Sequence, residues 1–125
     1  TMKRIISSPF APKAVGPYSQ AVEANGTLYI SGQLPIDPST GKMAEGIEAQ
    51  TARSLDNIRA ILEEAGYTLD DVVKSTVLLA DIADFGAMNA VYAKYYTKDM
   101  PARVCYEVAN LPMGALVEIE TIAVK

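Results

Sequence analysis

The chain has 125 residues, half of them hydrophobic and 21% charged, a composition typical of one globular domain spanning residues 1–125. The net charge is −4 and no basic cluster exceeds the pair Lys3-Arg4, which argues against a protein that binds the phosphate backbone of a nucleic acid. The absence of histidine removes the commonest general base and metal ligand, and one cysteine is too few for a zinc site, so we expect neither a metal nor another cofactor.

The first twenty residues predict one short strand followed by a loop rich in chain breakers. The strand is expected within residues 2–7, and the prolines in residues 9–12 predict an extended segment after it. Gly16-Pro-Tyr-Ser-Gln20 then presents Tyr18 from a rigid loop. Tyr18 is either a site residue or a side chain that packs this loop against the domain.

A β-hairpin is predicted next. Asn25-Gly26 suits a type I′ turn, and strand-forming residues flank it at 21–24 and 27–31. Gly32 is expected to end the second strand, which places Ser31-Gly32 at a strand end. This pair either offers backbone N–H groups to an anion or is a plain strand exit.

The middle of the chain predicts two helices with a strand between them. Residues 46–65 carry apolar side chains at helical spacing and end at Gly66, a typical C-terminal cap. Residues 72–79 are rich in β-branched and apolar side chains, which predicts a central strand. A second helix is expected over residues 83–97, capped by an aspartate at 81 or 84. Its inward stripe is expected to contain Phe85, Met88, Tyr92 and Tyr95, with Asn89 and Tyr96 at the flanks.

The last quarter of the chain predicts two strands, residues 101–108 and 115–124, that pair across a six-residue loop. Alternation along the first strand is expected to bury Val104, Tyr106 and Val108 and to leave a polar face. That face is expected to carry Arg103, Cys105, Glu107, Glu118 and Glu120. It is either a functional site or an ordinary solvated sheet face, and alternation alone does not decide between them.

The predicted order of elements is β-β-β-α-β-α-β-β, which indicates an α+β fold: one sheet of five to six strands with two helices packed on one face. Two helices cover only one face of such a sheet. The other face is therefore expected to be wet or to be covered by another subunit.

The remaining features concern the location of the chain. Its single cysteine cannot form a disulfide within the chain, and no apolar run approaches the ~20 residues that span a bilayer. No secretory signal is visible, and Met2, preceded by Thr1, is expected to be the natural start. We therefore expect a cytoplasmic protein without a membrane segment.

Arg103 is the strongest candidate for binding a ligand. A guanidinium group matches a carboxylate with two parallel hydrogen bonds, so Arg103 can anchor a small carboxylic acid, unless it forms an ion pair with Glu118 or Glu120 instead. A carboxylate beside the ligand can orient a water molecule and accept its proton. Nothing in the sequence lowers the pKa of Cys105, so we expect a wall residue or a backbone contact there, not a nucleophile.

Several segments together carry a resemblance to a known family. Read in order along nearly the whole chain, the sequence resembles the Rid family (the YjgF/UK-type proteins), and most closely its RidA branch of reactive-intermediate imine deaminases. The segments that carry the resemblance are Gly16-Pro-Tyr-Ser-Gln20, Ile30-Ser-Gly-Gln-Leu-Pro35, Asn89, Pro101-Ala-Arg-Val-Cys105 and Val117-Glu-Ile-Glu120.

The resemblance implies a chorismate-mutase-like fold and a homotrimer with its sites in clefts between subunits. It implies hydrolysis of 2-imino acids, such as 2-iminopropanoate and 2-iminobutanoate, to 2-keto acids and ammonia. By position, Arg103 would grip the substrate carboxylate, the backbone of Cys105 would hold the imine nitrogen, and Glu118 would orient or activate water. The cleft would be lined by Tyr18, Ser31 and Gly32, with Asn89 near its wall.

Two positions depart from the pattern of the resembled family. Val104 stands where a small residue such as serine is frequent, and Met113-Gly114 where a Lys-Asp type pair is common. Both bear on the rim of the site and on substrate range. A non-catalytic or chaperone-like protein that binds small carboxylates is the alternative function. RNA cleavage is a further one, against which the acidic balance and the missing histidine count.

Overall fold

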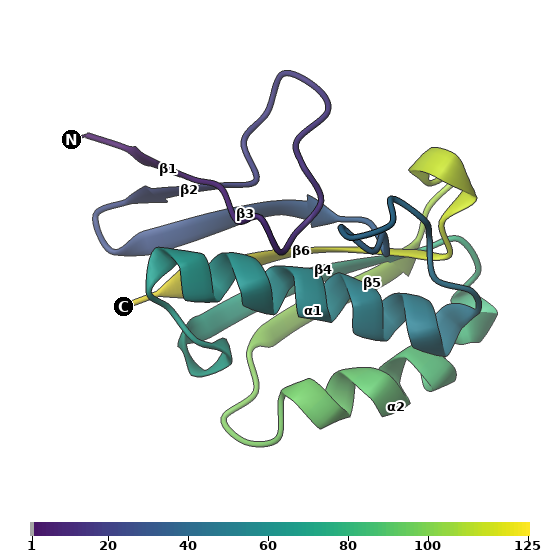
Figure 1. Cartoon of the computed structure of the whole chain (residues 1–125). Coiled ribbons are helices and arrows are strands. Elements are labelled where there is room, and N and C mark those ends of the chain that lie inside the picture. The colour runs from purple at the N-terminus through teal and green to yellow at the C-terminus, as the bar shows by residue number, and fades with distance from the viewer. Residues whose placement is uncertain (1) are drawn as a thin grey trace.

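The computed structural model describes residues 2–125 and contains one mixed sheet of six strands with two helices on one of its faces (Figure 1). The strands lie side by side in the order β1-β2-β3-β6-β4-β5. The α+β class and the predicted order of elements are both confirmed. The expectation that Met2 is the natural start concerns Thr1, which lies outside the described residues. The strands are β1 Arg4–Ile6, β2 Ala21–Ala24, β3 Thr27–Gln33, β4 Val72–Leu79, β5 Ala102–Glu107 and β6 Val117–Val124, and the helices are α1 Ile47–Ala65 and α2 Phe85–Tyr95.

The hairpin between β2 and β3 forms where the sequence predicts it. Asn25 and Gly26 both have positive φ, 51° and 76°, as a type I′ turn requires. Strand β3 runs past Gly32 to Gln33, and its pairing with β6 is interrupted between Ile30 and Gln33. This irregularity lies at the end of β3 where the sequence predicted a strand exit.

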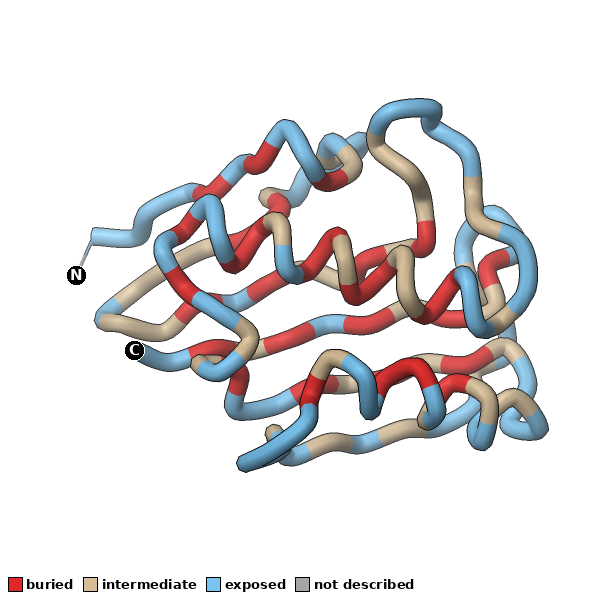
Figure 2. The backbone as a smooth tube through the Cα atoms, turned by 60° about the horizontal axis from the view of Figure 1, so that its bottom comes forward, coloured by how far each residue is buried: buried red, intermediate tan, exposed pale blue. Residues whose placement is uncertain are grey.

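The core lies between the sheet and the two helices. Helix α1 buries one stripe, which includes Leu55, Ile58 and Leu62, and ends as predicted at Gly66 in the left-handed conformation. Figure 2 shows buried residues recurring along α1 and the central strands. Strand β4 lies between β5 and β6, which confirms the prediction of a central strand. Within residues 2–125, neither helix is both long and apolar enough to cross a membrane.

The predicted pairing of the last two strands is wrong. Strands β5 and β6 flank β4 on opposite sides, β5 parallel to it and β6 antiparallel. The segment between them therefore crosses over the end of β4, and a hairpin does not form. Short three-residue 3-10 turns, one of them at Pro112–Gly114, complete the connections.

The predicted polar face is also wrong, because its members lie on opposite faces of the sheet. Arg103 and Cys105 pair with the buried residues Ser75 and Val77 and so share the helix-covered face. Glu118 alternates with the buried Val117 and Ile119 and so lies on the bare face. The same alternation places Glu107 with Arg103 and Glu120 with Glu118.

The bare face of the sheet is unusually apolar for a surface. By register, it carries side chains from strands β1, β3, β5 and β6. The large hydrophobic residues exposed there are Ile5, Tyr29, Val104, Tyr106 and Val124. Several large apolar side chains exposed on one sheet face, even with Glu118 and Glu120 between them, are typical of a surface that another molecule covers.

Candidate functional site

Arg103 lies at the edge strand β5, and its guanidinium group is held by helix α2. Its Nη1 donates a 2.7 Å hydrogen bond to Oδ1 of Asn89. The guanidinium carbon lies 4.8 Å from the ring centroid of Tyr92 and 5.4 Å from that of Phe85, which are cation–π distances. The half-buried arginine is therefore fixed by one amide and two aromatic rings.

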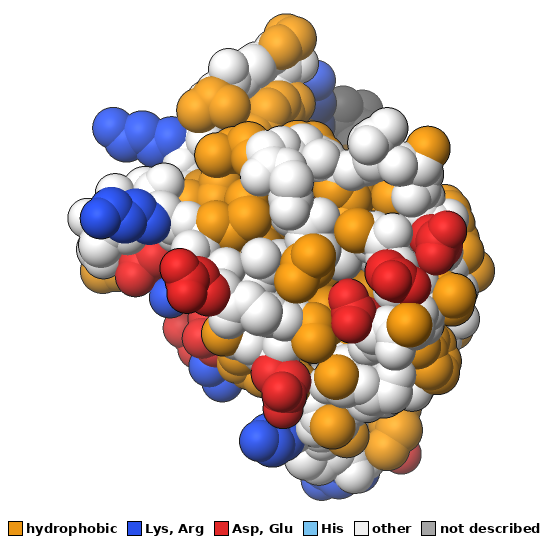
Figure 3. Space-filling model, turned by 90° about the vertical axis from the view of Figure 1, so that its right-hand side faces the viewer, with side chains coloured by type: hydrophobic (Ala, Val, Ile, Leu, Met, Phe, Trp, Pro, Cys, Tyr) orange, Lys and Arg blue, Asp and Glu red, His pale blue; other side chains and the backbone are white. Residues whose placement is uncertain are grey.

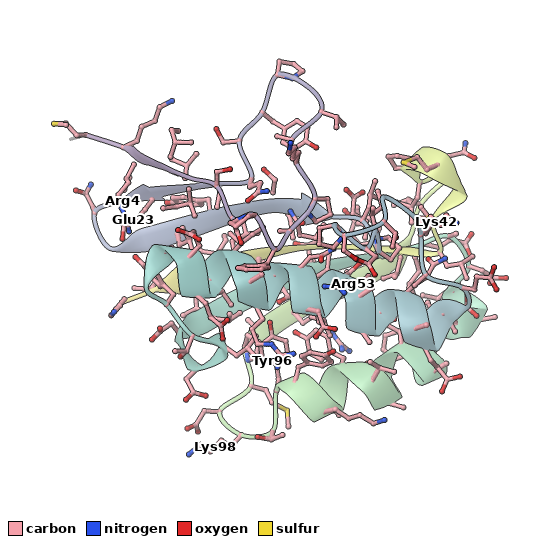
Figure 4. All side chains as sticks on the ribbon, in the orientation of Figure 1. Arg4, Glu23, Lys42, Arg53, Tyr96 and Lys98 are labelled. Carbon is pink, nitrogen blue, oxygen red and sulfur yellow. The ribbon has the colours of Figure 1, made fainter. Side chains whose placement is uncertain are left out.

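Arg103 has no carboxylate partner among residues 2–125. The ion pairs within that range are Arg4 with Glu23 and Arg59 with Asp56, and Figure 4 shows the first of them at the end of the sheet near the N-terminus. The cross-strand pair with Glu118 or Glu120 that the sequence left open does not form. A half-buried guanidinium held only by neutral groups keeps its charge and N–H donors available for an anion.

A pocket of about 440 Å³ opens beside Arg103. It lies between α2 and the start of β5, and Asn89, Tyr92 and Tyr96 line it together with Met100 and Pro101. Figure 4 shows Tyr96 turned in between the helices and the sheet, whereas Lys98 points outward from the turn after α2. The arginine thus meets a concave surface large enough for a small organic acid.

Cys105 is two residues further along β5 and packs against the core. Burial raises the pKa of its thiol, and the nearby Arg103 opposes that shift only in part. The cysteine is thus a poor nucleophile, as expected. Because β5 is the edge strand, one side of its backbone has no strand partner in the described chain, and a backbone role for Cys105 stays a prediction.

Glu118 lies against the backbone of β3. A β-carbon built on Gly32 would stand 2.6 Å from Oε2 of Glu118, so only glycine leaves room for this carboxylate. Burial, and secondarily the charge of Glu120, raise the pKa of Glu118 above the usual range of a glutamate. A carboxyl group with a raised pKa is better matched to accepting and returning protons near neutral pH.

The loop that carries Tyr18 is fastened to the same strand. Ser31 donates a 2.6 Å hydrogen bond from Oγ to the carbonyl of Ser19, and its N–H donates to the carbonyl of Gln20. Tyr18 is half exposed and lines a second pocket of about 320 Å³, together with Gly32 and Met113. Figure 3 looks at this end of the molecule and shows hydrophobic side chains gathered in its upper part, with acidic side chains below them.

The predicted site residues therefore form two groups, not one. The first group surrounds Arg103 on the helix-covered face and contains Asn89 and Cys105. The second consists of Glu118 and Gly32 on the other face, together with Ser31 and Tyr18, which are connected to Gly32 through the Tyr18 loop and its pocket. A single copy of the chain does not bring the two groups together. Within residues 2–125, no group of three or more His, Cys, Asp or Glu side chains is placed to hold a metal ion.

Sequence reasoning assigned Phe85 and Tyr92 to the core stripe of the second helix and so missed their contact with Arg103. A signal was present in the spacing. Phe85, Asn89 and Tyr92 recur at four and three residues, which places an amide between two aromatic rings on one helix face. A polar side chain within such a stripe needs a hydrogen-bond partner, and Arg103 provides it.

Known proteins resemble this chain over its whole length. The family model described as Endoribonuclease L-PSP matches residues 9–125. A protein of Capra hircus named 2-iminobutanoate/2-iminopropanoate deaminase is 52% identical, over 99% of this chain and 91% of that protein. The crystal structure of a Rid-family protein from Yersinia pestis has a TM-score of 0.97 at 48% identity, covering 99% of this chain and all of that one.

A further solved structure includes a ligand. The structure of TdcF from E. coli with bound serine has a TM-score of 0.95 at 38% identity, and the match covers 98% of both chains. The resemblance seen in the sequence is thus confirmed by the family model, by sequence identity and by three-dimensional structure. The chain belongs to the Rid family, whose family model is described as Endoribonuclease L-PSP.

Proposed function

We propose that this protein is an enzyme that hydrolyses 2-imino acids, such as 2-iminopropanoate and 2-iminobutanoate, to 2-keto acids and ammonia. The observation that carries the proposal is Arg103, a half-buried arginine positioned by α2 and left without a carboxylate partner in residues 2–125. Relatives 48–52% identical over 99% of this chain are named for this activity. The serine bound by TdcF carries the α-carboxylate that such an arginine would grip.

The reaction needs one positioned water molecule and one group that moves protons. Water attacks C2 of the imine and gives a proton to Glu118, which forms a carbinolamine. Glu118 returns the proton to the nitrogen and then takes the proton of the carbinolamine hydroxyl as the C–N bond breaks, which releases ammonia and the 2-keto acid. Transfer of this last proton to the ammonia restores the Glu118 carboxylate. The protonated imine is already a good electrophile, so orientation by Arg103 and proton transfer by Glu118 are sufficient without a covalent intermediate.

We propose that the complete site forms between copies of the chain in a homotrimer. Arg103 and Glu118 lie on opposite faces of one sheet, so a small substrate cannot contact both in a single copy. A second copy whose apolar bare face packs along the β5 edge of the first could bring its own Glu118 group to the Arg103 group of the first. The single free cysteine agrees with the cytoplasmic location that forms part of this proposal.

Trapping of the imine tests the activity. An amino-acid oxidase generates the 2-imino acid, and semicarbazide captures the fraction that survives. The wild-type protein should lower the captured fraction, and Arg103→Ala should restore it to the level seen without protein. Equal capture with and without the wild-type protein would show that the chain does not hydrolyse imines.

Mixing two inactive variants tests the assembly. Arg103→Ala retains Glu118 and Glu118→Gln retains Arg103, so each variant alone lacks one half of every site. After joint unfolding and refolding, a cyclic trimer with one residue from each neighbour should recover about a quarter of wild-type activity. If each chain held a complete site, the mixture would stay as inactive as its components.

The alternatives drawn from the sequence are less well supported. Non-catalytic binding is not favoured, because curated relatives about 50% identical are named as deaminases. The family description mentions an endoribonuclease. A net charge of −4 and the absence of histidine do not favour RNA cleavage by this chain.

A further inference from the structure

We propose that Tyr92 and Phe85 are positioning residues for Arg103: their rings form an aromatic cradle that fixes the guanidinium plane in which the substrate carboxylate is bound. This inference rests on the proposed function, because it assigns Arg103 the carboxylate. It adds two residues, Phe85 and Tyr92, that the helical stripe predicted only as packing residues. Phe85, Tyr92 and the amide of Asn89 together make up the cradle.

The ring of Tyr92, and not its hydroxyl, makes the contact with Arg103. The ring centroid lies 4.8 Å from the guanidinium carbon. The hydroxyl is buried and has no hydrogen-bond partner of good geometry among residues 2–125. Burial raises the pKa of Tyr92, against smaller opposing effects of Ser75 and Arg103, so the phenol stays neutral. The aromatic face therefore acts on Arg103 through its quadrupole.

Tyr92 is itself held in place from behind. Its ring lies 4.7 Å from that of Tyr96 at an interplanar angle of 41°, and both side chains are buried, 6% and 4% exposed. A ring packed in this way cannot rotate away from the arginine. Tyr96 packs against Tyr92, and Tyr92 packs against Arg103. The rigid core therefore restricts the motion of the half-buried guanidinium group.

Asn89 fixes the remaining freedom of the guanidinium group. Its Oδ1 occupies one N–H of Nη1, and no other hydrogen bond of the Arg103 side chain forms within residues 2–125. The rings define the plane and the amide defines the rotation within it. The donors left over then point in a fixed direction, which a two-point contact with a carboxylate requires.

The experiment measures the affinity for 2-ketobutanoate by calorimetry, with imine turnover measured in parallel. Tyr92→Leu and Phe85→Leu remove one ring each and are expected to weaken binding about tenfold, since one cation–π contact is lost. Their KM should rise while kcat stays close to wild type, because a carboxylate anchor stabilises bound substrate and transition state alike. Tyr92→Phe keeps the ring and should bind within about twofold of wild type.

Tyr95→Leu is the matched control. It removes a comparable cation–π pair on the same helix, since Arg59 lies 5.2 Å from the Tyr95 ring, and it should leave the affinity unchanged. Thermal melting shows which variants are folded. If Tyr92→Leu does not fold, Phe85→Leu decides, because that ring is 36% exposed and its loss spares the core.

The outcomes separate this inference from the proposed function. Wild-type affinity in Phe85→Leu and in folded Tyr92→Leu, with binding lost in Arg103→Ala, would overturn the cradle and leave the anchor intact. Equally weak binding by Tyr92→Phe and Tyr92→Leu would overturn the role of the ring. Unchanged binding by Arg103→Ala would overturn the anchor itself.

Discussion

The two groups of site residues hold their charges by opposite means. The Arg103 group surrounds a cation with bulky side chains, two aromatic rings and an amide, all from α2. In the Glu118 group, the carboxylate lies against the backbone of Gly32, where there is no side chain to displace it. The position of the Arg103 guanidinium depends on the side chains of Phe85, Asn89 and Tyr92. The position of the Glu118 carboxylate depends on the missing β-carbon of Gly32.

This difference predicts how each group can be damaged. Truncating a ring loosens the arginine, whereas adding a single methyl group displaces the carboxylate. It also separates stability from activity. The rings of the first group belong partly to the core, but Glu118 is a half-buried carboxylate that makes no hydrogen bond or ion pair with residues 2–125. A group of that kind lowers stability while it serves the reaction.

Glu118→Gln should have the largest effect in the second group. Loss of the group that moves protons is expected to lower kcat by about 10²–10⁴-fold, since that is the usual contribution of general acid–base catalysis. The variant should bind 2-ketobutanoate nearly as well as wild type, because Arg103 is intact. Stopped-flow measurement of imine loss provides kcat. A kcat within twofold of wild type would remove Glu118 from the reaction.

The same variant should be more stable than wild type at neutral pH. The folded-state pKa of Glu118 is raised, so its stabilising contribution is present at low pH and is lost as pH rises through that pKa. Glutamine carries no charge and avoids this loss. Melting temperatures should therefore differ at pH 7 and converge in acid, whereas a lower melting temperature at pH 7 would contradict the assignment.

Gly32→Ala should have the next largest effect. The new methyl group meets Oε2 of Glu118 at 2.6 Å, and the flexible carboxylate moves, because Gly32 itself has no positive φ that alanine would strain. Displacement by about 1 Å is expected to lower turnover by up to about 10²-fold with little change in melting temperature. Gly86→Ala is the control, since its methyl group meets nothing within 4 Å. Equal activity in both variants would show that the carboxylate position does not matter.

The pH dependence of turnover should reveal the raised pKa of Glu118. The carboxylate is the active form, so kcat should fall as pH drops through this pKa, at a pH above that expected for an ordinary glutamate. Glu120→Gln removes a neighbouring negative charge that raises the pKa and should move this limb to lower pH. The buffer rate, subtracted at each pH, corrects for spontaneous hydrolysis. If the acid limb of the pH profile stayed at the same pH in Glu120→Gln, a group other than Glu118 would be responsible for it.

Local patterns in the sequence predicted most of the fold because they depend on neighbouring residues. The apolar stripe of residues 46–65, the cap at Gly66 and the turn at Asn25-Gly26 each form as expected. Residue chemistry indicated Arg103 and a nearby carboxylate as candidate site residues, and the resemblance singled out Glu118 among the carboxylates and added Asn89. How those residues divide between the faces of the sheet depended on long-range pairing, which alternation along one strand does not specify.

Strand β5 shows why the face was misjudged. Val104 and Tyr106 are more apolar than Arg103 and Cys105, so hydrophobicity alone turns the strand the wrong way. In the structure the apolar pair lies on the bare face and Arg103 lies under α2. Apolar residues on the bare face are stable if another copy of the chain covers that face. A charged arginine under α2 is stable because aromatic rings contact its guanidinium group.

Ser31→Ala should have the smallest effect on activity, and it tests how far the Tyr18 loop depends on its side-chain hydrogen bond to β3. The substitution removes the 2.6 Å hydrogen bond to Ser19 but keeps the backbone contact with Gln20, so the loop loosens without detaching. We expect a rise in KM of about threefold, in line with a net hydrogen-bond contribution near 0.5–1 kcal/mol. Ser54→Ala, which removes a buried hydroxyl without a partner in residues 2–125, should leave KM unchanged. If Ser31→Ala matched Ser54→Ala, the side-chain hydrogen bond of Ser31 would contribute nothing to substrate binding, and the backbone contact with Gln20 alone would hold the Tyr18 loop.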